Sequence, residues 1–309
     1  MTSNLTHARS VVRFAPLPLW EPLGEHRSIY GYLIAGRPLY AHALERAAEL
    51  FDGTLCIVVD DSMLAQDGQA LDEIGSYGRV ILPPNLDDDH LALSPAFPML
   101  DGCWLELRYP WHLLDVMSDV LQGLEQRIEA DVDIEPGVEF SGKVVLETGV
   151  KVMGGARFKG NIYVGPDSII GNSALLRGDV SIGPNSLVGL CGEVKNSLLL
   201  GHALVGPMTT VHETIAEEDC FFGGTTRISN YRLDGNNVEV LIGGELVDTG
   251  RKQFGTILAA GVKFGGACLI LPGRKIGARC EIGPHVVVSQ NLSPRKRVML
   301  RQDLDIRDL

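Results

Sequence analysis

The stretch VGPDSIIGNSALLRGDVSIGPNSLVG, residues 164–189, repeats a pattern in which an aliphatic side chain is followed closely by turn residues. A spacing of six fits neither the 3.6-residue period of an α-helix nor the two-residue period of a strand. It is typical of a parallel β-helix, in which three short strands and three corners form a coil of about 18 residues. The same step keeps an apolar residue at Ile134, Phe140, Leu146, Val152, Phe158, Val164, Ile170, Leu176, Ile182, Val188, Val194 and Leu200.

A second run with the same step predicts roughly two further coils. Between the two runs, residues 201–257 keep the pattern imperfectly, and we expect the chain to leave the β-helix over Asp234–Lys252. Loops that leave a regular scaffold frequently carry function. The second run comprises Leu258, Phe264, Ile270, Ile276, Ile282 and Val288.

The residues before position 130 follow different periods, which predict a small α/β domain. The predicted strands are Tyr30–Ile34, Leu55–Val59 and Val80–Leu82, and the predicted helices are Pro38–Phe51 and Trp111–Ile128. We therefore expect a mainly β protein with three parts: an α/β domain over 1–130, a parallel β-helix over 131–292 and a basic tail over 293–309.

Composition excludes several classes of protein. The chain has 309 residues, 45% hydrophobic and 21% charged, which is typical of a soluble globular protein and not of a disordered one. A formal net charge of −12 disfavours nucleic acid as a partner. No apolar stretch approaches the roughly 20 residues that cross a bilayer. The six cysteines form no CxxC pair and the N-terminus has no signal-peptide pattern, so we expect a cytoplasmic protein.

Several motifs resemble the acetyltransferase half of the bifunctional sugar-1-phosphate nucleotidyltransferase/acetyltransferases. The resemblance covers about residues 110–291. It implies a left-handed β-helix with hexapeptide repeats, a homotrimer, acetyl-CoA or another acyl-CoA as co-substrate, and a sugar phosphate or nucleotide sugar as acceptor. The motifs are Glu193-Val194-Lys195-Asn196-Ser197, Phe222-Gly223-Gly224-Thr225-Thr226, Asn230-Tyr231 with Asp234-Gly235, Thr249-Gly250-Arg251-Lys252, and Ile270-Leu271-Pro272-Gly273, the last two resembling the archaeal members.

The N-terminal part looks like a truncated sugar nucleotidyltransferase domain. Gly36-Arg37-Pro38-Leu39 and Pro110-Trp111-His112-Leu113-Leu114 resemble two landmarks of that family. The family opens with a glycine-rich loop whose backbone amides hold the triphosphate, yet residues 11–23 contain no glycine. Without amides that approach the phosphates closely, the domain has no phosphate site. We expect no nucleotidyl transfer.

Arg177 and Lys195 match the Arg and Lys that hold the amino-sugar phosphate in the resembled acetyltransferases. They lie 18 residues apart, so we expect them to stack on one edge of the β-helix. Two cations at such a spacing suit a phosphate or a carboxylate. The alternative is a solvated ladder in which Glu213, the next residue in the same column, is an ion-pair partner.

The general base of the resembled enzymes has no direct counterpart. Its histidine falls on Pro207 when the chain is counted without gaps, or on Met208 after one insertion, and neither can accept a proton. We predict His212 as the replacement, with His202 as the alternative. An imidazole has a pKa close to the working pH. Adjacent residues on a strand point to opposite faces, which disfavours direct pairing of His212 with Glu213.

Two further groups are candidates for binding. By resemblance, Asn230 and Tyr231 approach the acyl group and the neighbouring subunit, although an Asn in a turn with a packing Tyr would look the same. Arg295, Lys296 and Arg297 form the densest basic cluster, and in proteins of the resembled fold such a position often holds CoA phosphates. A solubilising tail is the alternative.

We predict no metal. Asp60-Asp61 follows a predicted strand, where a carboxylate can bind metal or ribose, but a turn is favoured. Asp87-Asp88-Asp89-His90 resembles a string of metal ligands, yet acidic runs are usually solvated loops. Two functions remain: an acyltransferase acting on an amino or hydroxyl group of a small polar acceptor, and a catalytically silent trimer that binds a sugar nucleotide or acts as a scaffold.

Overall fold

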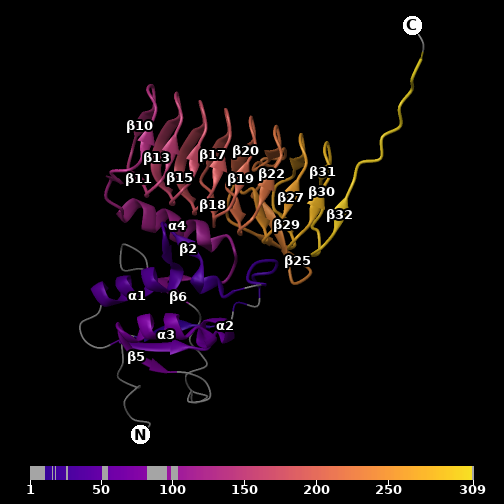
Figure 1. Ribbon diagram of the computed structural model, residues 1–309. Coiled ribbons are helices and arrows are strands. Elements are labelled where there is room, and N and C mark those ends of the chain that lie inside the picture. The colour runs from indigo at the N-terminus through magenta and orange to yellow at the C-terminus, as the bar shows by residue number, and fades with distance from the viewer. Residues whose placement is uncertain are drawn as a thin grey trace.

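A computed structural model describes residues 11–15, 17, 19–25, 27–50, 55–81, 96–98 and 104–307. A long β-helix and an N-terminal α/β domain lie side by side, with one helix running between them (Figure 1). The elements before the β-helix are β1 (Val11–Phe14), the short 3-10 helix η1 (Ile29–Gly31), β2 (Leu33–Ile34), β3 (Arg37–Pro38), α1 (Leu39–Leu50), β4 (Leu55–Val59), α2 (Ser62–Gln66), α3 (Gly68–Gly75), β5 (Gly78–Ile81), β6 (Ala96–Pro98), β7 (Trp104–Glu106) and α4 (His112–Gly123).

The β-helix has three faces, each built from short parallel strands stacked coil upon coil. The first face contains β9 (Asp133–Ile134), β12 (Lys151–Val152), β14 (Ile169–Ile170), β16 (Leu187–Val188), β19 (Leu204–Val205), β22 (Phe221–Phe222), β27 (Lys263–Phe264), β30 (Glu281–Ile282) and β32 (Arg297–Val298). The second face contains β10 (Glu139–Ser141), the first halves of β13 (Arg157–Val164) and β15 (Leu175–Ile182), β17 (Glu193–Lys195), β20 (Thr210–His212), β23 (Arg227–Ile228), β28 (Leu269–Ile270) and β31 (Val287–Val288).

The third face continues from the second around a corner, and β13 and β15 run through that corner without a break. Gly160 and Gly178 make this possible, because both have positive φ and a Cβ on Gly160 would lie 2.3 Å from the carbonyl oxygen of Gly178. The third face contains β8 (Arg127–Ile128), β11 (Val144–Leu146), the second halves of β13 and β15, β18 (Leu198–Leu199), β21 (Ile215–Ala216), β26 (Thr256–Leu258) and β29 (Arg274–Ile276).

The hexapeptide prediction is confirmed for the interior, with a shift of register at one coil. The predicted residues from Leu146 to Val194 line the buried core, but Leu199 then replaces Leu200. The coil from Lys195 to His212 is one residue shorter than the preceding one, so the pattern moves by one position. Leu200 points instead into a separate hydrophobic cluster, which joins the β-helix to the N-terminal domain.

The first coil also differs from the prediction. Ile134 and Phe140 keep 38% and 36% of their surfaces exposed, because no complete coil stacks beneath them.

The N-terminal domain packs on the third face of the β-helix. Its parallel sheet has the order β1-β4-β5, as expected for an α/β unit. Tyr163, Leu198 and Ile215 of the third face share a buried cluster with the helices and strands of this domain. The buried carboxylate of Glu217 adds polar contacts by accepting hydrogen bonds from the Tyr32 hydroxyl and, at 2.8 Å, from the backbone of Gly24. The third face is therefore covered within one chain.

Two predicted elements have different limits in the structure. The predicted helix Trp111–Ile128 stops at Gly123, because Arg127–Ile128 already pairs with β11 of the β-helix. The predicted strand Tyr30–Ile34 begins as the η1 helix, and only Leu33–Ile34 is extended.

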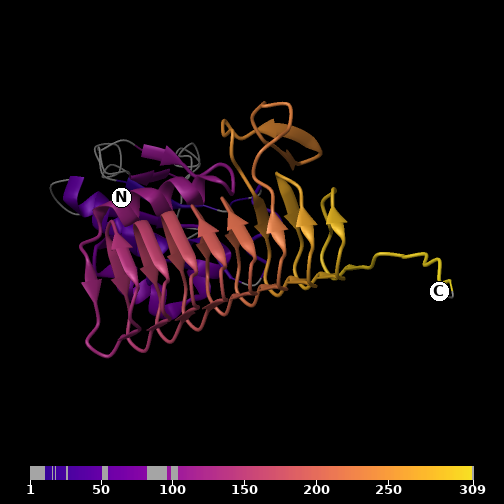
Figure 2. The same cartoon turned by 90° about the horizontal axis from the view of Figure 1, so that it is seen from above.

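The predicted excursion is confirmed. The β-helix register passes directly from Ile215 to Ile257, and the intervening chain contains the antiparallel hairpin of β24 (Glu239–Ile242) and β25 (Glu245–Asp248). This segment projects away from the coils (Figure 2).

The fold class is as predicted: mainly β, with a left-handed hexapeptide-repeat β-helix preceded by a small α/β unit. The domain limits 1–130, 131–292 and 293–309 stay a proposal. Within the described ranges, no helix has the length and apolar character to span a membrane.

Replacing Phe264 by Ala tests the packing of the core. Its ring is fully buried and stacks on Phe222 of the coil below, with ring centroids 5.6 Å apart. Loss of this ring leaves a cavity, so we expect the free energy of unfolding to fall by about 3–5 kcal/mol. Lys263→Ala, the exposed neighbour on the same strand, should change it by less than about 0.5 kcal/mol. Urea unfolding of both variants checks this, and equal losses would contradict the assignment of the core.

Candidate functional site

Three polar side chains form a column on the second face of the β-helix. The strand register pairs Arg177 with Lys195 and Lys195 with His212, so the three residues occupy the same position on successive coils. The expected stacking of Arg177 on Lys195 is therefore confirmed. Glu213, predicted as the next member of the column, is displaced by one position because the shortened coil turns at Asn196.

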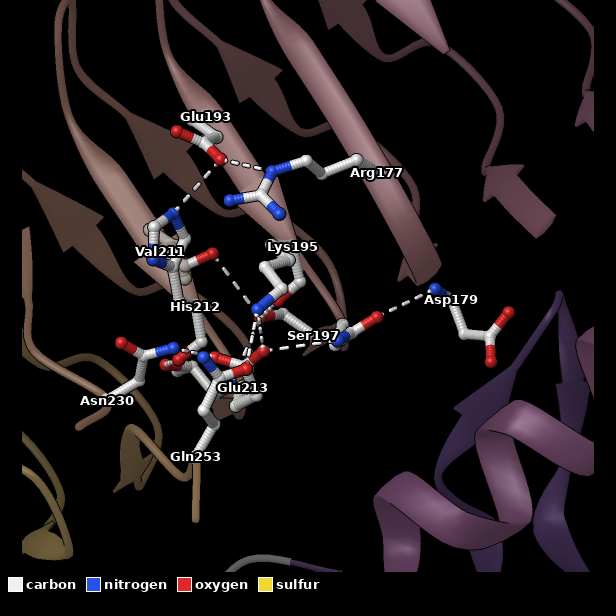
Figure 3. A network of polar contacts seen from close by, with 12 residues as sticks. Arg177, Asp179, Glu193, Lys195, Ser197, Val211, His212, Glu213, Asn230 and Gln253 are labelled. Carbon is white, nitrogen blue, oxygen red and sulfur yellow. Dashed lines mark hydrogen bonds and ion pairs between the residues drawn. The ribbon is translucent and has the colours of Figure 1, made fainter. Parts of the chain in front are cut away.

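Glu193 connects the two ends of this column. It lies on the same strand as Lys195 and two residues before it, so both side chains point outward from the second face. Its Oε1 atom accepts a hydrogen bond from Nε of Arg177 at 2.5 Å and lies 3.3 Å from Nε2 of His212 (Figure 3). The carboxylate beside the histidine is thus Glu193 and not Glu213, in keeping with the expectation that His212 and Glu213 do not pair directly.

Glu213 is the centre of a second set of contacts at the corner between the second and third faces. Its backbone has positive φ, and its side chain is only 4% exposed. Oε1 lies 2.7 Å from Nζ of Lys195 and accepts a hydrogen bond from Nδ2 of Asn196 at 3.1 Å. Oε2 accepts a hydrogen bond from the side-chain amide of Asn230. Lys195 also donates to Oε1 of Gln253 at 2.9 Å, which ties the excursion to the column.

The environment of His212 favours the neutral imidazole. Burial lowers the pKa of His212 below its ordinary value; Arg177 and Lys195 act in the same direction, while Glu193 and Glu213 oppose them. Nε2 is shielded from solvent beside Glu193 without an aligned hydrogen bond to any described residue. The imidazole therefore lies beside a carboxylate, and as a neutral ring it has one nitrogen that can accept a proton.

The structure brings Asn230 to this site but leaves other predicted residues elsewhere. Tyr231 follows Asn230, is 50% exposed and forms a backbone bridge with Gln253. Arg295, Lys296 and Arg297 belong to the last coil, where Arg297 pairs with Glu281 at 2.6 Å on the first face. They make no contact with the column within the described chain.

The alternative base positions lie at corners of the β-helix and not on its second face. His202 is exposed with positive φ at the corner between the third and first faces. Pro207 and Met208 occupy the corner between the first and second faces, and Met208 is 54% exposed. Register thus brings His212, and none of these three, into line with Arg177 and Lys195.

The acidic pair Asp60-Asp61 has structural contacts. Asp60 forms an ion pair with Arg13 at 2.6 Å, and Asp61 caps the N-terminus of α2 by accepting hydrogen bonds from two backbone amides. The run Asp87-Asp88-Asp89-His90 lies outside the described residues. Across the part of the chain that the structure describes, no cluster of three or more His, Cys, Asp or Glu side chains could hold a metal ion.

Sequence reasoning missed three members of the site, namely Glu193, Asn196 and Gln253. Glu193 had a usable signal, because it stands two residues before Lys195 and side chains alternate along a strand. Asn196 and Gln253 had none. Their roles depend on the shortened coil and on the path of the excursion.

The β-helix and this column define a hexapeptide-repeat protein of the left-handed β-helix class. A family model described as the GMPPB C-terminal domain matches residues 158–249. A bifunctional sugar-1-phosphate nucleotidylyltransferase/acetyltransferase of Sulfurisphaera tokodaii is 31% identical over 194 residues, which are 62% of this chain and 48% of that protein. The bifunctional protein GlmU of Methanocaldococcus jannaschii is 34% identical over 210 residues, 68% of this chain and 51% of that one. The resemblance predicted from the motifs, to a GlmU-like family with a C-terminal hexapeptide domain, is confirmed.

The chain spans about half the length of the curated relatives it matches. Among solved structures, a GDP-perosamine N-acetyl transferase from Caulobacter crescentus is 16% identical, with a TM-score of 0.18 over 94% of this chain and 93% of that one.

The lowered pKa of His212 makes stability depend on pH. The unfolded chain binds a proton near pH 6.5 while folded His212 does so at lower pH, so the unfolded state holds more protons between the two values. The free energy of unfolding should therefore fall as the pH drops below about 6.5. In His212→Gln this decline should be shallower, as measured by urea unfolding at a series of pH values. Identical slopes in the two proteins would contradict the burial of a neutral His212.

Proposed function

We propose that the chain is an acyltransferase that moves an acyl group, with acetyl-CoA as the expected donor, to an amino or hydroxyl group of a sugar phosphate or nucleotide sugar. The observation that carries this proposal is the column of Arg177, Lys195 and His212, which sets two cations and a neutral imidazole side by side. The names of the relatives, which include acetyltransferases, support the same class of reaction.

Arg177 and Lys195 would hold the anionic part of the acceptor. Arg177 donates Nε to Glu193, its side chain is 39% exposed, and no described residue takes a hydrogen bond from its two terminal nitrogens. Those nitrogens suit phosphate oxygens, which guanidinium binds in a bidentate manner. Lys195 is more buried and is positioned by Glu213 and Gln253, so we assign it to orientation of the same group.

His212 would act as the general base. Nδ1 takes the proton from the attacking amine or hydroxyl while the nucleophile adds to the thioester carbonyl. The carbon–sulfur bond then breaks, and the imidazolium returns the proton to the leaving thiolate, which gives free CoA. Glu193 stabilises the imidazolium during this step. Alignment of acceptor and thioester would supply much of the remaining rate.

Replacing His212 by Gln tests this role. We expect CoA release with a working acceptor to fall about 10²–10⁴-fold, because the proton acceptor is lost. His202→Gln, at the corner between the third and first faces, should keep the wild-type rate. Release of CoA can be followed with a thiol reagent, using a panel of amino-sugar phosphates and nucleotide sugars as acceptors. Full activity of His212→Gln would remove the assignment.

Arg295, Lys296 and Arg297 are proposed to bind the CoA phosphates. The side chains of Arg295 and Arg297 are 69% and 71% exposed, so phosphates can reach them. The basic cluster does not contact the column of Arg177, Lys195 and His212 within the described chain. We therefore propose that acetyl-CoA binds between two chains. No metal is part of it.

A homotrimer is proposed as the working assembly. The third face is covered by the N-terminal domain, but the first face carries outward apolar side chains on successive coils, among them Leu187, Leu204 and Phe221. Leu204 and Phe221 are 39% and 38% exposed, and Leu190 and Met208 extend the patch at the neighbouring corner. An exposed apolar patch of this kind is typical of a protein–protein interface.

Leu204→Glu tests the assembly. A charge in the middle of the apolar patch should cost desolvation in the interface and shift the protein toward the monomer. Gln126→Glu introduces the same charge at an exposed position after α4 and should leave the assembly unchanged. Sedimentation equilibrium measures the mass of both variants. A wild-type monomer, or a Leu204→Glu trimer, would contradict this interface.

A catalytically silent binding protein is the second candidate. Both cations of the column already face carboxylates, and Pro207 and Met208 stand where the resembled enzymes have their base. In that case a thermal-shift titration would detect the binding of nucleotide sugars. No CoA would be released from acetyl-CoA with any acceptor. We also place the protein in the cytoplasm, consistent with the unbridged thiols of Cys191, Cys220, Cys268 and Cys280.

A further inference from the structure

A cleft of about 450 Å³ lies at the corner where the column of the second face meets the N-terminal domain. One wall is α4, which contributes Leu114, Met117 and Ser118. The opposite wall is the β-helix corner, and the segment at the end of the excursion closes a third side. Figure 3 shows α4 on the far side of Asp179 from the column. The cleft is thus bounded by three segments far apart in the sequence.

The β-helix wall of the cleft presents polar groups that are held in place before any ligand arrives. Asp179 accepts a hydrogen bond from Nδ2 of Asn161 at 2.8 Å and another from the Ser118 hydroxyl. Its backbone amide donates to Oδ1 of Asn196 at 3.0 Å, and Asn196 in turn donates to Glu213. Carboxylates and amides fixed in this way suit ligands with several hydroxyl groups, because each oxygen can accept more than one hydrogen bond.

Apolar atoms of α4 lie at the base of the cleft. Leu114 and Met117 border it but are only 4% and 1% exposed, so they offer little open surface. A pyranose ring has hydroxyl groups around its edge and an apolar face of C–H groups. Polar groups along the walls and apolar atoms at the base therefore match a sugar ring better than they match a second phosphate.

The charges around the cleft point the same way. Asp179, Glu213 and Asp115 border it, and Asp115 forms an ion pair with Arg251 on the rim. Carboxylates outnumber the cations of Arg251 and Lys252. An uncharged or amino sugar is favoured there over a group with its own negative charge.

Two residues connect the cleft to the column. Glu213 and Gln253 border the cleft, and both contact Nζ of Lys195. A molecule with its sugar ring in the cleft can therefore direct an attached phosphate toward Lys195 and Arg177. We propose that this cleft is the carbohydrate subsite of the acceptor, and that α4 of the N-terminal domain forms one of its walls. The proposal rests on the proposed function only in naming this carbohydrate as the acceptor.

Ser118→Trp and Asp179→Asn test the cleft in different ways. The first fills it, and the second keeps the shape of the wall while removing one carboxylate oxygen. Gln126→Trp, at an exposed position after α4 and not among the residues that border the cleft, is the matched control. Binding of glucosamine, glucosamine 1-phosphate and inorganic phosphate at millimolar concentrations is measured by isothermal titration calorimetry on the full chain. The thermal shift with acetyl-CoA reports donor binding, and the unfolding midpoint without ligand reports folding.

We expect both sugar probes to bind the wild type and Gln126→Trp equally. Ser118→Trp and Asp179→Asn should bind them at least about tenfold more weakly, a loss of ~1.4 kcal/mol, and phosphate should bind as before. If Ser118→Trp does not fold, Asp179→Asn carries the test. Undiminished sugar binding in the folded cleft variants, or no binding of either sugar to the wild type, would overturn the proposal. Loss of sugar binding in the variants without CoA release from the wild type would overturn the proposed function alone.

Discussion

Each coil of the β-helix is hydrogen-bonded to the coils on either side, and this requirement places every side chain directly above its counterpart in the coil below. Inside, the register stacks aliphatic groups into one continuous core. Outside, it converts residues distant in sequence into neighbours, so the column of Arg177, Lys195 and His212 needs no special loop to assemble it. The site is therefore as rigid as the coils that carry it.

The fold could be predicted because the sequence pattern that produces it is periodic. One inward aliphatic in every six residues is visible in a single sequence, and so are the excursion and the change of pattern near residue 130. The site could be predicted only in part. Arg177 and Lys195 were aligned by the 18-residue spacing, but the next coil is one residue shorter, and nothing in the apolar pattern announced that the chain would turn at Asn196. Counting by a constant period therefore put Glu213 where His212 stands.

The N-terminal domain covers the third face of the β-helix. It buries Tyr163, Leu198 and Ile215 on the third face, and the carboxylate of Glu217 accepts hydrogen bonds from both parts of the chain. Covering one face leaves two available for other contacts, one apolar and one carrying the column. This contact could not be predicted from sequence, because outward residues on a β-helix follow no period that distinguishes an intramolecular partner from an intermolecular one.

The exposed first coil has a consequence for behaviour in concentrated solution. The N-terminal end of a β-helix is an open strand edge, and its unpaired backbone groups are a template on which another chain can add strands. Ile134 and Phe140 make that edge attractive, since each has more than a third of its surface in water. Charges surround it: Arg127 pairs with Glu129 and, at 2.6 Å, with Glu147, while Asp133 and Glu139 begin the neighbouring strands. These charges oppose end-to-end polymerisation of the coils, so the first coil is the place where neutralising substitutions would turn a discrete particle into a fibre.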